Sequence, residues 1–310
     1  MKTRIFGDGM VEKRPCVATI GFFDGVHRGH RHLIGEVTSR AHDLGLESTV
    51  VTFDRHPRQV VATDFRPKLL STMEEKLVLL QKSGVDNCVV LPFDKEMASM
   101  SAHDFMSQIL MERLGVTILY TGYDHRFGHN RSEGFADYVE YGRQMGMEVL
   151  RGKPYLLDGV NVSSSVVRSL LEAGEVRHAS SCLGYPYTLL GHVVSGEHVG
   201  TGIGFPTANV KVDDDLKLIP DNGVYAVKVH VAGCDEEKDA MLNIGMRPTF
   251  DGKAMTIEAH IFHFSGDIYG KQIAVSFFDK IRDERKFRSS AELAVQLEAD
   301  ALKAEEMLRG

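Results

Sequence analysis

The spacing of apolar segments changes near the middle of the chain, and this change limits the folds available to it. In the first half, short apolar runs such as CVATIGFF (16–23) and ESTVVTF (47–53) alternate with segments of helical periodicity such as 28–44. Such alternation predicts a parallel sheet covered by helices on both faces. From Tyr187 to about Asp279, strand-like runs follow one another without helices between them. This second pattern predicts a closed antiparallel barrel.

The predicted elements divide the chain into an α/β domain, 1–182, and a barrel domain, 183–310. Strands in the first domain are predicted at 16–23, 47–53, 87–93, 116–122 and 147–151. Helices there are predicted at 28–44, 72–82, 102–114 and 134–145. Barrel strands are predicted within 188–196, 205–212, 223–233, 239–245, 256–264 and 271–278. A capping-box pattern at Ser289 and Glu292 then starts a helix whose apolar face should pack against the barrel.

Composition narrows the functional classes. The net charge is −7, from 36 basic and 43 acidic residues, which argues against broad nucleic-acid binding. Cys16, Cys88, Cys182 and Cys234 form no CxxC pair, so we expect reduced core thiols in a cytoplasmic protein. No apolar run reaches the ~18 residues of a membrane span, and the first residues lack the apolar core of a signal peptide. We therefore expect small-molecule substrates and no nucleic-acid or membrane partner; a homo-oligomer stays open.

The motif H-x-G-H lies where the first predicted strand gives way to the first predicted helix. It consists of His27 and His30, with Gly29 between them. A helix N-terminus attracts phosphate, and two imidazoles there can donate hydrogen bonds to a phosphoryl group during its transfer. The glycine lets a ligand approach the backbone closely. The residues alone leave two alternatives open: surface histidines near a turn, and a metal site without nearby ligands to complete it.

A second informative stretch, GIGFPTANV (202–210), lies at the start of the predicted barrel. Its glycines allow backbone N–H groups to surround a phosphate. Thr207 and Asn209 are two residues apart on a predicted strand, so their oxygen atoms can meet one Mg²⁺. The alternative is an ordinary glycine-rich turn before a strand.

Several motifs carry a family resemblance. GFFDGVHRGH (21–30) resembles the N-terminal module of bacterial bifunctional riboflavin kinase/FAD synthetases, within the nucleotidyltransferase superfamily. The family's usual form is G-N-F-D-G-V-H-x-G-H, so Phe22 stands where asparagine is usual. TFDRHPR (52–58) resembles the family's T-F-x-P-H-P, with Arg55 in place of the first proline.

The resemblance extends along the chain in order. YTGYDHRFGHNRSEG (120–134) is similar to a family segment that usually has phenylalanine where His125 stands. VNVSSSVVR (160–168) resembles V-S-S-T-x-I-R, with Ser165 in place of threonine. The tetrapeptide PTAN (206–209) resembles the flavokinase signature.

This resemblance implies an HxGH nucleotidyltransferase domain followed by a flavokinase barrel with a C-terminal helix. The barrel would use ATP to phosphorylate riboflavin to FMN. The first domain would transfer AMP from a second ATP to FMN, giving FAD and pyrophosphate. Both steps would require Mg²⁺.

The resemblance also implies roles for individual residues. His27 and His30 would stabilise charge on the α-phosphate, and Glu258 would deprotonate the ribityl 5′-hydroxyl of riboflavin. The residues implied to bind ATP for adenylylation are Gly21, Phe23, Asp24, Gly29, Ser164, Ser165 and Arg168. Those implied to bind flavin there are Asp124 and Arg131. In the kinase, the implied ATP-binding residues are Gly200, Gly202, Gly204, Thr207 and Asn209, of which Thr207 and Asn209 would also hold the metal. Arg285 would contact the flavin in the kinase.

Other interpretations stay open from the residues. Glu258 is also compatible with an outward-facing strand residue, with His260 on the same side by alternation. The departures at Phe22 and His125 leave room for a different phosphorylated acceptor. A flavin- or nucleotide-binding regulator with a decayed site is a further alternative, against which the retained histidines and Glu258 argue. A nucleic-acid role through likeness to aminoacyl-tRNA synthetases conflicts with the acidic charge.

Overall fold

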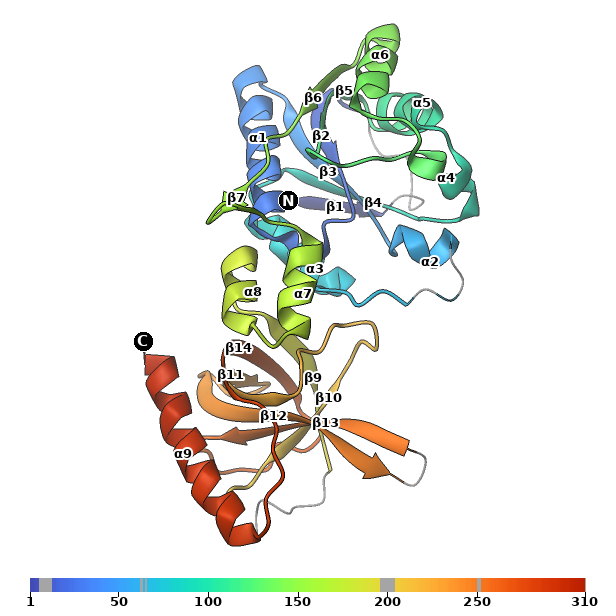
Figure 1. Cartoon of the computed structure of the whole chain (residues 1–310). Coiled ribbons are helices and arrows are strands. Elements are labelled where there is room, and N and C mark those ends of the chain that lie inside the picture. Colours follow the sequence, from blue (N-terminus) through green and yellow to red (C-terminus); the bar gives the residue numbers. More distant parts are fainter. Residues whose placement is uncertain (6–12, 62–63, 65, 196–203, 250–251, 310) are drawn as a thin grey trace. The chain divides into compact units, whose positions relative to one another are not determined.

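The computed structural model describes residues 1–5, 13–61, 64, 66–195, 204–249 and 252–309. The chain divides into two compact units, Met1–Ser164 and Ser165–Gly310 (Figure 1). A parallel six-stranded sheet in the order β1-β4-β3-β2-β5-β6 forms the first unit. Its strands are β1 (Lys2–Ile5), β2 (Cys16–Ile20), β3 (Glu47–Phe53), β4 (Asn87–Leu91), β5 (Val116–Thr121) and β6 (Glu148–Arg151). The predicted parallel sheet is confirmed, and β1 adds an edge strand too short and polar to stand out in the sequence.

Helices cover both faces of this sheet. The helical segments are η1 (Asp24–Val26), α1 (Arg28–Leu44), α2 (Pro57–Val61), α3 (Met73–Lys82), α4 (Lys95–Ser99), α5 (Ala102–Asp104), η2 (Phe105–Arg113), η3 (His129–Arg131) and α6 (Phe135–Met145). Apolar residues of α1 and α3 pack on one face, and those of α5, η2 and α6 pack on the other. The segment η2 is π-helical, where the sequence predicts a regular helix over 102–114.

The strand order explains where a ligand site should form. From β2 the chain proceeds through β3 and β4 on one side, and then returns to β5 and β6 on the other side. Parallel α/β sheets bind ligands beyond the carboxyl ends of the strands at such a reversal. The H-x-G-H motif follows the carboxyl end of β2, so the topology places it at this point.

Along the chain, a small hairpin and two helices follow β6 and precede β9. The hairpin pairs β7 (Leu156–Leu157) with β8 (Val160–Asn161). Helices α7 (Ser164–Glu172) and α8 (Val176–Leu183) follow it. Among the residues that the structure describes, none of the helices combines the length and the apolar character needed to span a bilayer.

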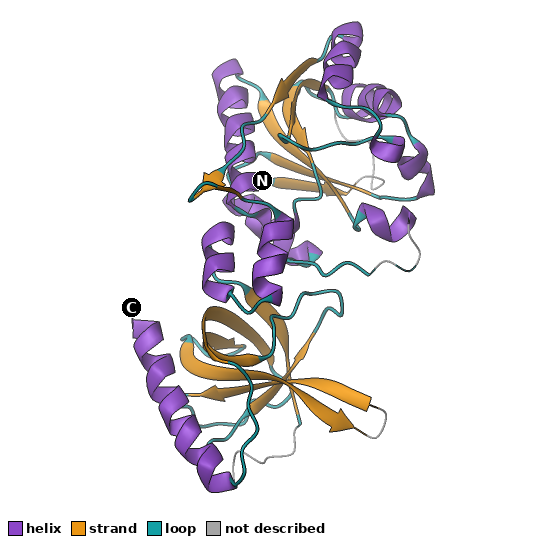
Figure 2. Ribbon diagram, viewed as in Figure 1, coloured by secondary structure: helices purple, strands orange, loops and turns teal. Residues whose placement is uncertain are grey.

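The second unit contains a closed antiparallel barrel, whose strands are orange in Figure 2. The strand order is β10-β13-β12-β11-β14-β9. Its strands are β9 (Thr188–Val194), β10 (Ala208–Val212), β11 (Gly223–Val231), β12 (Lys238–Thr249), β13 (Gly252–Ile261) and β14 (Gln272–Arg282). Small and branched side chains such as Val227, Ala240, Leu242, Ala259 and Val275 are fully buried. The predicted barrel is therefore confirmed.

Helix α9 (Ser290–Arg309) packs on the outside of the barrel, as its apolar face predicts. Ala304 is buried among Val224, Met241 and Ile281. The Ser289 hydroxyl accepts a hydrogen bond from the Glu292 amide at 3.2 Å, which confirms the predicted cap. In a complete capping box, the Glu292 carboxylate would accept a hydrogen bond from the Ser289 backbone N–H. Here it accepts one from the Arg288 backbone N–H instead.

All four cysteines are free, as expected. Cys16, Cys88 and Cys182 are buried. The prediction that all four are core residues is wrong for Cys234, which is partly exposed in the turn after β11.

Candidate active sites

His27 and His30 are brought together by the start of α1. His27 is the N-cap residue, and its Nδ1 accepts a hydrogen bond from the backbone N–H of His30 at 3.3 Å. The two rings stack with centroids 3.6 Å apart, and His27 is only 4% exposed. Because Nδ1 is an acceptor, a neutral His27 carries its proton on Nε2. That nitrogen is then a hydrogen-bond donor.

The loop before His27 has an unusual backbone. Phe23 and Val26 have φ values of 53° and 34°. These values lie in the left-handed region, which residues other than glycine rarely adopt. Each such residue costs about 1–3 kcal/mol, so the surrounding structure must hold the loop in place. The Phe23 ring lies edge-on to His30, and it also comes close to Gly21, where a Cβ would lie 3.1 Å from it.

Asp24 supplies part of that support. Its carboxylate is 2% exposed and accepts hydrogen bonds from the backbone N–H groups of Leu70 and Ser71 at 3.0–3.1 Å. The Ser71 hydroxyl in turn accepts from the Gly25 N–H at 2.9 Å. These contacts support a positioning role for Asp24, and its predicted contact with ATP stays a prediction.

Lys76 supplies the rest of the support, and sequence reasoning missed it. Its ammonium donates to the Phe22 carbonyl at 3.1 Å and to the Phe53 carbonyl at 3.3 Å. Thr52 Oγ1 is a third acceptor at 3.5 Å. Lys76 lies within the predicted helix 72–82, where a charged residue ordinarily indicates the solvated face. No sequence signal marked it as buried.

Gly29 and Ser164 connect the motif to the start of α7. A Cβ on Gly29 would lie 2.9 Å from the Val162 carbonyl oxygen and 3.1 Å from the His27 ring. The Ser164 hydroxyl donates to the Asp24 carbonyl at 3.1 Å. The structure thus brings Ser164 to the H-x-G-H loop. Ser165 and Arg168 are also on α7, within the second compact unit, and their contacts with phosphate stay predictions.

The segment after β5 groups the two residues predicted to bind flavin. Asp124 and Arg131 are both exposed, and both charges act on His125. Burial lowers the pKa of His125 to about 4; Arg131 also lowers it and Asp124 opposes the shift. The imidazole is therefore neutral near pH 7. It stands as an uncharged polar ring where the family usually has phenylalanine.

In the barrel, strand register aligns Glu258 with two amides. Glu258 on β13 is paired with Asn209 on β10 and with Asn243 on β12. The next pair along these strands, Leu242 with Ala259, has fully buried side chains on the barrel interior. By alternation, Asn209, Glu258 and Asn243 lie in one row on the outer face. Asn243 was not predicted, because nothing in the sequence specified the register of β12 against β13.

His260 holds the PTAN segment against this row. Its Nδ1 lies 2.8 Å from the Pro206 carbonyl oxygen, and its ring contacts Phe205 and Phe262. Thr207 follows directly and precedes β10. The expected placement of His260 on the same side as Glu258 agrees with the strand register.

Of the remaining predicted kinase residues, the structure describes Gly204 and Arg285. Gly204 has a φ of 85°, a value that favours glycine. Gly200 and Gly202 lie outside the described residues. Arg285 is exposed and its guanidinium lies 4.6 Å from the Phe287 ring centroid. A Cβ on Gly245 would lie 2.4 Å from the Glu284 carboxylate and 3.2 Å from the Asn243 amide, so Glu284 reaches the row of polar residues.

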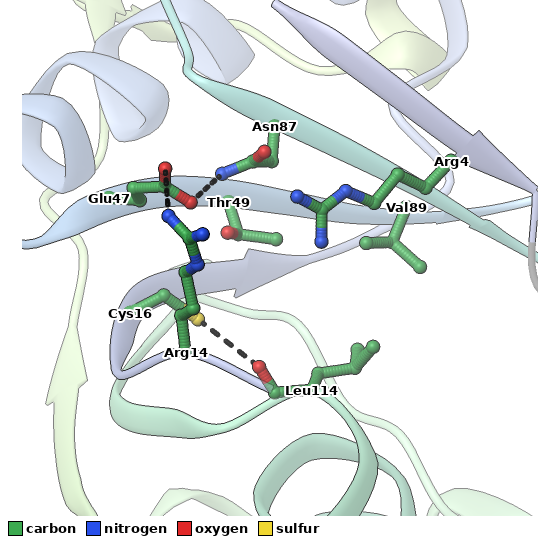
Figure 3. A pocket seen from close by; sticks show the side chains of 8 residues that line it. All are labelled: Arg4, Arg14, Cys16, Glu47, Thr49, Asn87, Val89 and Leu114. Atoms are coloured by element: carbon green, nitrogen blue, oxygen red, sulfur yellow. Dashed lines mark hydrogen bonds and ion pairs between the residues drawn. The ribbon is translucent and has the colours of Figure 1, made fainter. Parts of the chain in front are cut away.

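A cavity also lies at the opposite edge of the parallel sheet (Figure 3). Its lining includes Cys16, Glu47 and Asn87, which begin β2, β3 and β4. Glu47 pairs with Arg14 and accepts a hydrogen bond from Asn87 at 3.0 Å. Because it opens at the amino ends of the strands, this cavity is separate from the H-x-G-H site, and no predicted site residue lines it.

Comparison with known proteins identifies the families that the two parts of the chain match. The family model for FAD synthetase matches residues 10–166, and the model for riboflavin kinase matches residues 183–308. The bifunctional riboflavin kinase/FMN adenylyltransferase of Escherichia coli K12 is 38% identical, over 94% of this chain and 92% of its own length. The Bacillus subtilis enzyme of the same name is 34% identical over the same shares. The chain belongs to the bifunctional riboflavin kinase/FMN adenylyltransferase family.

A solved structure confirms the fold over the whole length. It has a TM-score of 0.88 and 29% identity, and covers 98% of this chain and 99% of its own. Its title describes a macrolide-efflux protein from Streptococcus pneumoniae. That description applies to the Streptococcus protein alone.

As a riboflavin kinase/FMN adenylyltransferase, the chain converts riboflavin to FMN and FMN to FAD. The family predicted from the motifs, the fold class and the two enzyme activities are thereby confirmed. Riboflavin, FMN, FAD and ATP are also confirmed as substrates or products. This outcome excludes the interpretation of the chain as a non-enzymatic regulator.

Proposed function

We propose that AMP transfer takes place at the β2–α1 loop within residues 1–182, and that riboflavin phosphorylation takes place on the outer face of the barrel within 183–310. The stacked pair of His27 and His30 at the N-terminus of α1 carries the first assignment. The row formed by Asn209, Glu258 and Asn243 carries the second.

In the adenylyl-transfer step, a phosphate oxygen of FMN attacks the α-phosphorus of ATP. The bond from that phosphorus to the bridging oxygen breaks, and pyrophosphate leaves. His27 donates from Nε2 to an α-phosphate oxygen as negative charge develops there, and His30 assists from the adjacent ring. The backbone at Gly21, Phe23 and Gly29 lets the nucleotide approach, and the chemistry needs no covalent nucleophile.

Ser164, Ser165 and Arg168 bind the departing pyrophosphate. Hydroxyl groups and free N–H groups at a helix start suit phosphate oxygens, and an arginine one turn later adds a bidentate donor. The hydrogen bond from Ser164 to the Asp24 carbonyl supports this placement. Asp124 and Arg131 bind the FMN acceptor.

In the kinase step, Glu258 accepts the proton of the ribityl 5′-hydroxyl as its oxygen attacks the γ-phosphorus of ATP, and ADP leaves. A carboxylate is a weak base for an alcohol, so it serves mainly to hold and align this nucleophile. Gly200, Gly202 and Gly204 bind the ATP phosphates, and Arg285 contacts the flavin.

Mg²⁺ fits the donors on this face. The Thr207 hydroxyl, the Asn209 amide oxygen and the Glu258 carboxylate opposite Asn209 are hard oxygen groups, which Mg²⁺ prefers. Thr207 and Asn209 would hold the ion. When bound, it neutralises charge on the transferred phosphoryl group. We place both activities in the cytoplasm, with small molecules as the partners; a homo-oligomer stays untested.

A pair of substitutions tests the assignment. His27→Ala should lower FAD formation by about 10²–10³-fold, the usual loss for one donor to a developing oxyanion, and leave FMN formation unchanged. Glu258→Ala should lower FMN formation by about 10²–10⁴-fold and spare FAD formation from supplied FMN. The matched controls are His42→Ala, on the exposed face of α1, and Glu237→Ala, in the turn before β12. Loss of both activities from either folded active-site variant would contradict the assignment.

The acceptor is tested by one incubation of the purified protein with riboflavin, ATP and Mg²⁺, with the flavins separated over time. FMN followed by FAD supports FMN as the acceptor. FMN alone would favour another phosphorylated acceptor at the H-x-G-H site, as the departures at Phe22 and His125 allow.

A further inference from the structure

Lys76 on α3, with Leu70 and Ser71 just before that helix, holds the H-x-G-H loop at three of its residues. The Phe22 carbonyl accepts from Lys76, the Asp24 carboxylate accepts from the backbone at Leu70 and Ser71, and the Gly25 N–H donates to Ser71. The loop held in this way contains the left-handed Phe23 and Val26 and leads directly to His27. These contacts therefore determine where the histidine pair lies.

The Lys76 side chain joins the ends of two neighbouring strands. Phe53 ends β3, and Phe22 follows β2, which is the neighbouring strand. The ammonium donates to both carbonyl oxygens, and Thr52 Oγ1, itself a donor to the Phe22 carbonyl, is the third acceptor. Lys76 also lies 4.0 Å from the Phe22 ring centroid and is 2% exposed. The three ammonium protons therefore match three protein acceptors at a position that is almost fully buried.

We propose that the Lys76 ammonium is a positioning residue for adenylyl transfer: by fixing the carbonyls of Phe22 and Phe53, it holds the loop that places His27 and His30. The proposal rests on the assignment of that reaction to the histidine pair. A neutral amine has only two protons and makes weaker, uncharged hydrogen bonds. Loss of the charge therefore releases one of the three oxygens and loosens the loop.

The charge of Lys76 changes in an accessible pH range. Burial lowers its pKa to about 8, although electrostatic interactions with Asp24, Cys88 and Asp54 oppose this shift. These belong to η1, to β4 and to the segment after β3. Burial raises the pKa of Cys88 to about 11, so Cys88 stays a neutral thiol over the same range. A group with a pKa of about 8 is only about one-tenth protonated at pH 9.

The experiment follows both products of one protein from pH 6.5 to 9.5. In the unmodified enzyme, FAD formation from supplied FMN should fall about tenfold between pH 7 and pH 9. FMN formation from riboflavin uses ATP as well, so it is the internal control and should show no such step at pH 8. An FAD rate that stays flat across this range would overturn the proposal without any variant.

Lys76→Met keeps the side-chain volume and removes the charge. We expect it to lower kcat for FAD formation at pH 7 at least tenfold, to leave FMN formation within about twofold, and to remove the step at pH 8. Lys82→Met, at an exposed position on the same helix, should keep both rates and the step. Circular dichroism checks that each variant is folded. A folded Lys76→Met enzyme with a normal FAD rate and the same step would refute the role of Lys76, whereas absence of FAD from the unmodified enzyme would instead refute the assigned reaction.

Discussion

Replacing Asp300 on α9 should destabilise the kinase barrel strongly. Asp300 is 2% exposed, and both of its carboxylate oxygens accept hydrogen bonds from Arg282 on β14 at 2.7–3.0 Å. Gln296 donates to the same carboxylate at 2.6 Å. Asp300→Ala therefore removes a bidentate partner and leaves the Arg282 guanidinium, which is only 19% exposed, without its counter-charge.

The magnitude follows from this burial. Removing one partner of a buried pair costs about 3–5 kcal/mol, because the other charge stays desolvated. For a unit of this size, about 2–4 °C per kcal/mol gives a fall in melting temperature on the order of 10 °C. Asp300→Asn keeps the shape and one acceptor, so it should cost about 1.5–3 kcal/mol.

The assay combines thermal unfolding with the two activities. Asp300→Ala should lose FMN formation at a lower temperature than the unmodified enzyme, while FAD formation from supplied FMN keeps its own temperature dependence. The double variant Arg282→Met/Asp300→Leu should recover most of the stability, because apolar residues of similar volume replace buried ion pairs at little cost. A loss below about 1 kcal/mol for Asp300→Ala, or no recovery in the double variant, would refute this reasoning.

Three further predictions concern the first unit. Gly29→Ala should slow FAD formation at least tenfold and spare FMN formation, because a Cβ would press on the Val162 carbonyl and the His27 ring. Thr72→Ala should cost about 1 kcal/mol in chemical denaturation, because it removes the capping box of α3. Between pH 8 and 10, stability should rise: the unfolded chain binds a proton at Lys76 that the folded chain has released. Thermal unfolding of Lys76→Met should lack that rise.

Periodicity predicted the architecture well. The helix predicted at 28–44 is α1 itself, and the strand predicted at 47–53 is β3. Both segments have strong patterns and clear ends, such as Gly45 in the left-handed region after α1. The strand predicted at 16–23 ends earlier, at Ile20, because the backbone turns into the loop that presents His27.

The contacts that organise the sites were harder to predict. Lys76 and Asp24 are polar residues whose burial depends on which segments meet in three dimensions. Asp24 was predicted to bind ATP, and its carboxylate is occupied by the backbone of residues 70–71. The alignment of Asn243 with Glu258 depends on barrel register, which arises only when the strands have paired.

The row across the barrel limits how its sequence can vary in length. Side chains along a strand alternate between faces, so moving β13 by one residue against β12 would turn Glu258 inward, toward the positions of Leu242 and Ile244. A single-residue deletion between Gly252 and Glu258 would thus bury a carboxylate and remove it from the riboflavin site that we propose. The strand that carries Glu258 must therefore keep the same number of residues between its pairing with β12 and its polar row.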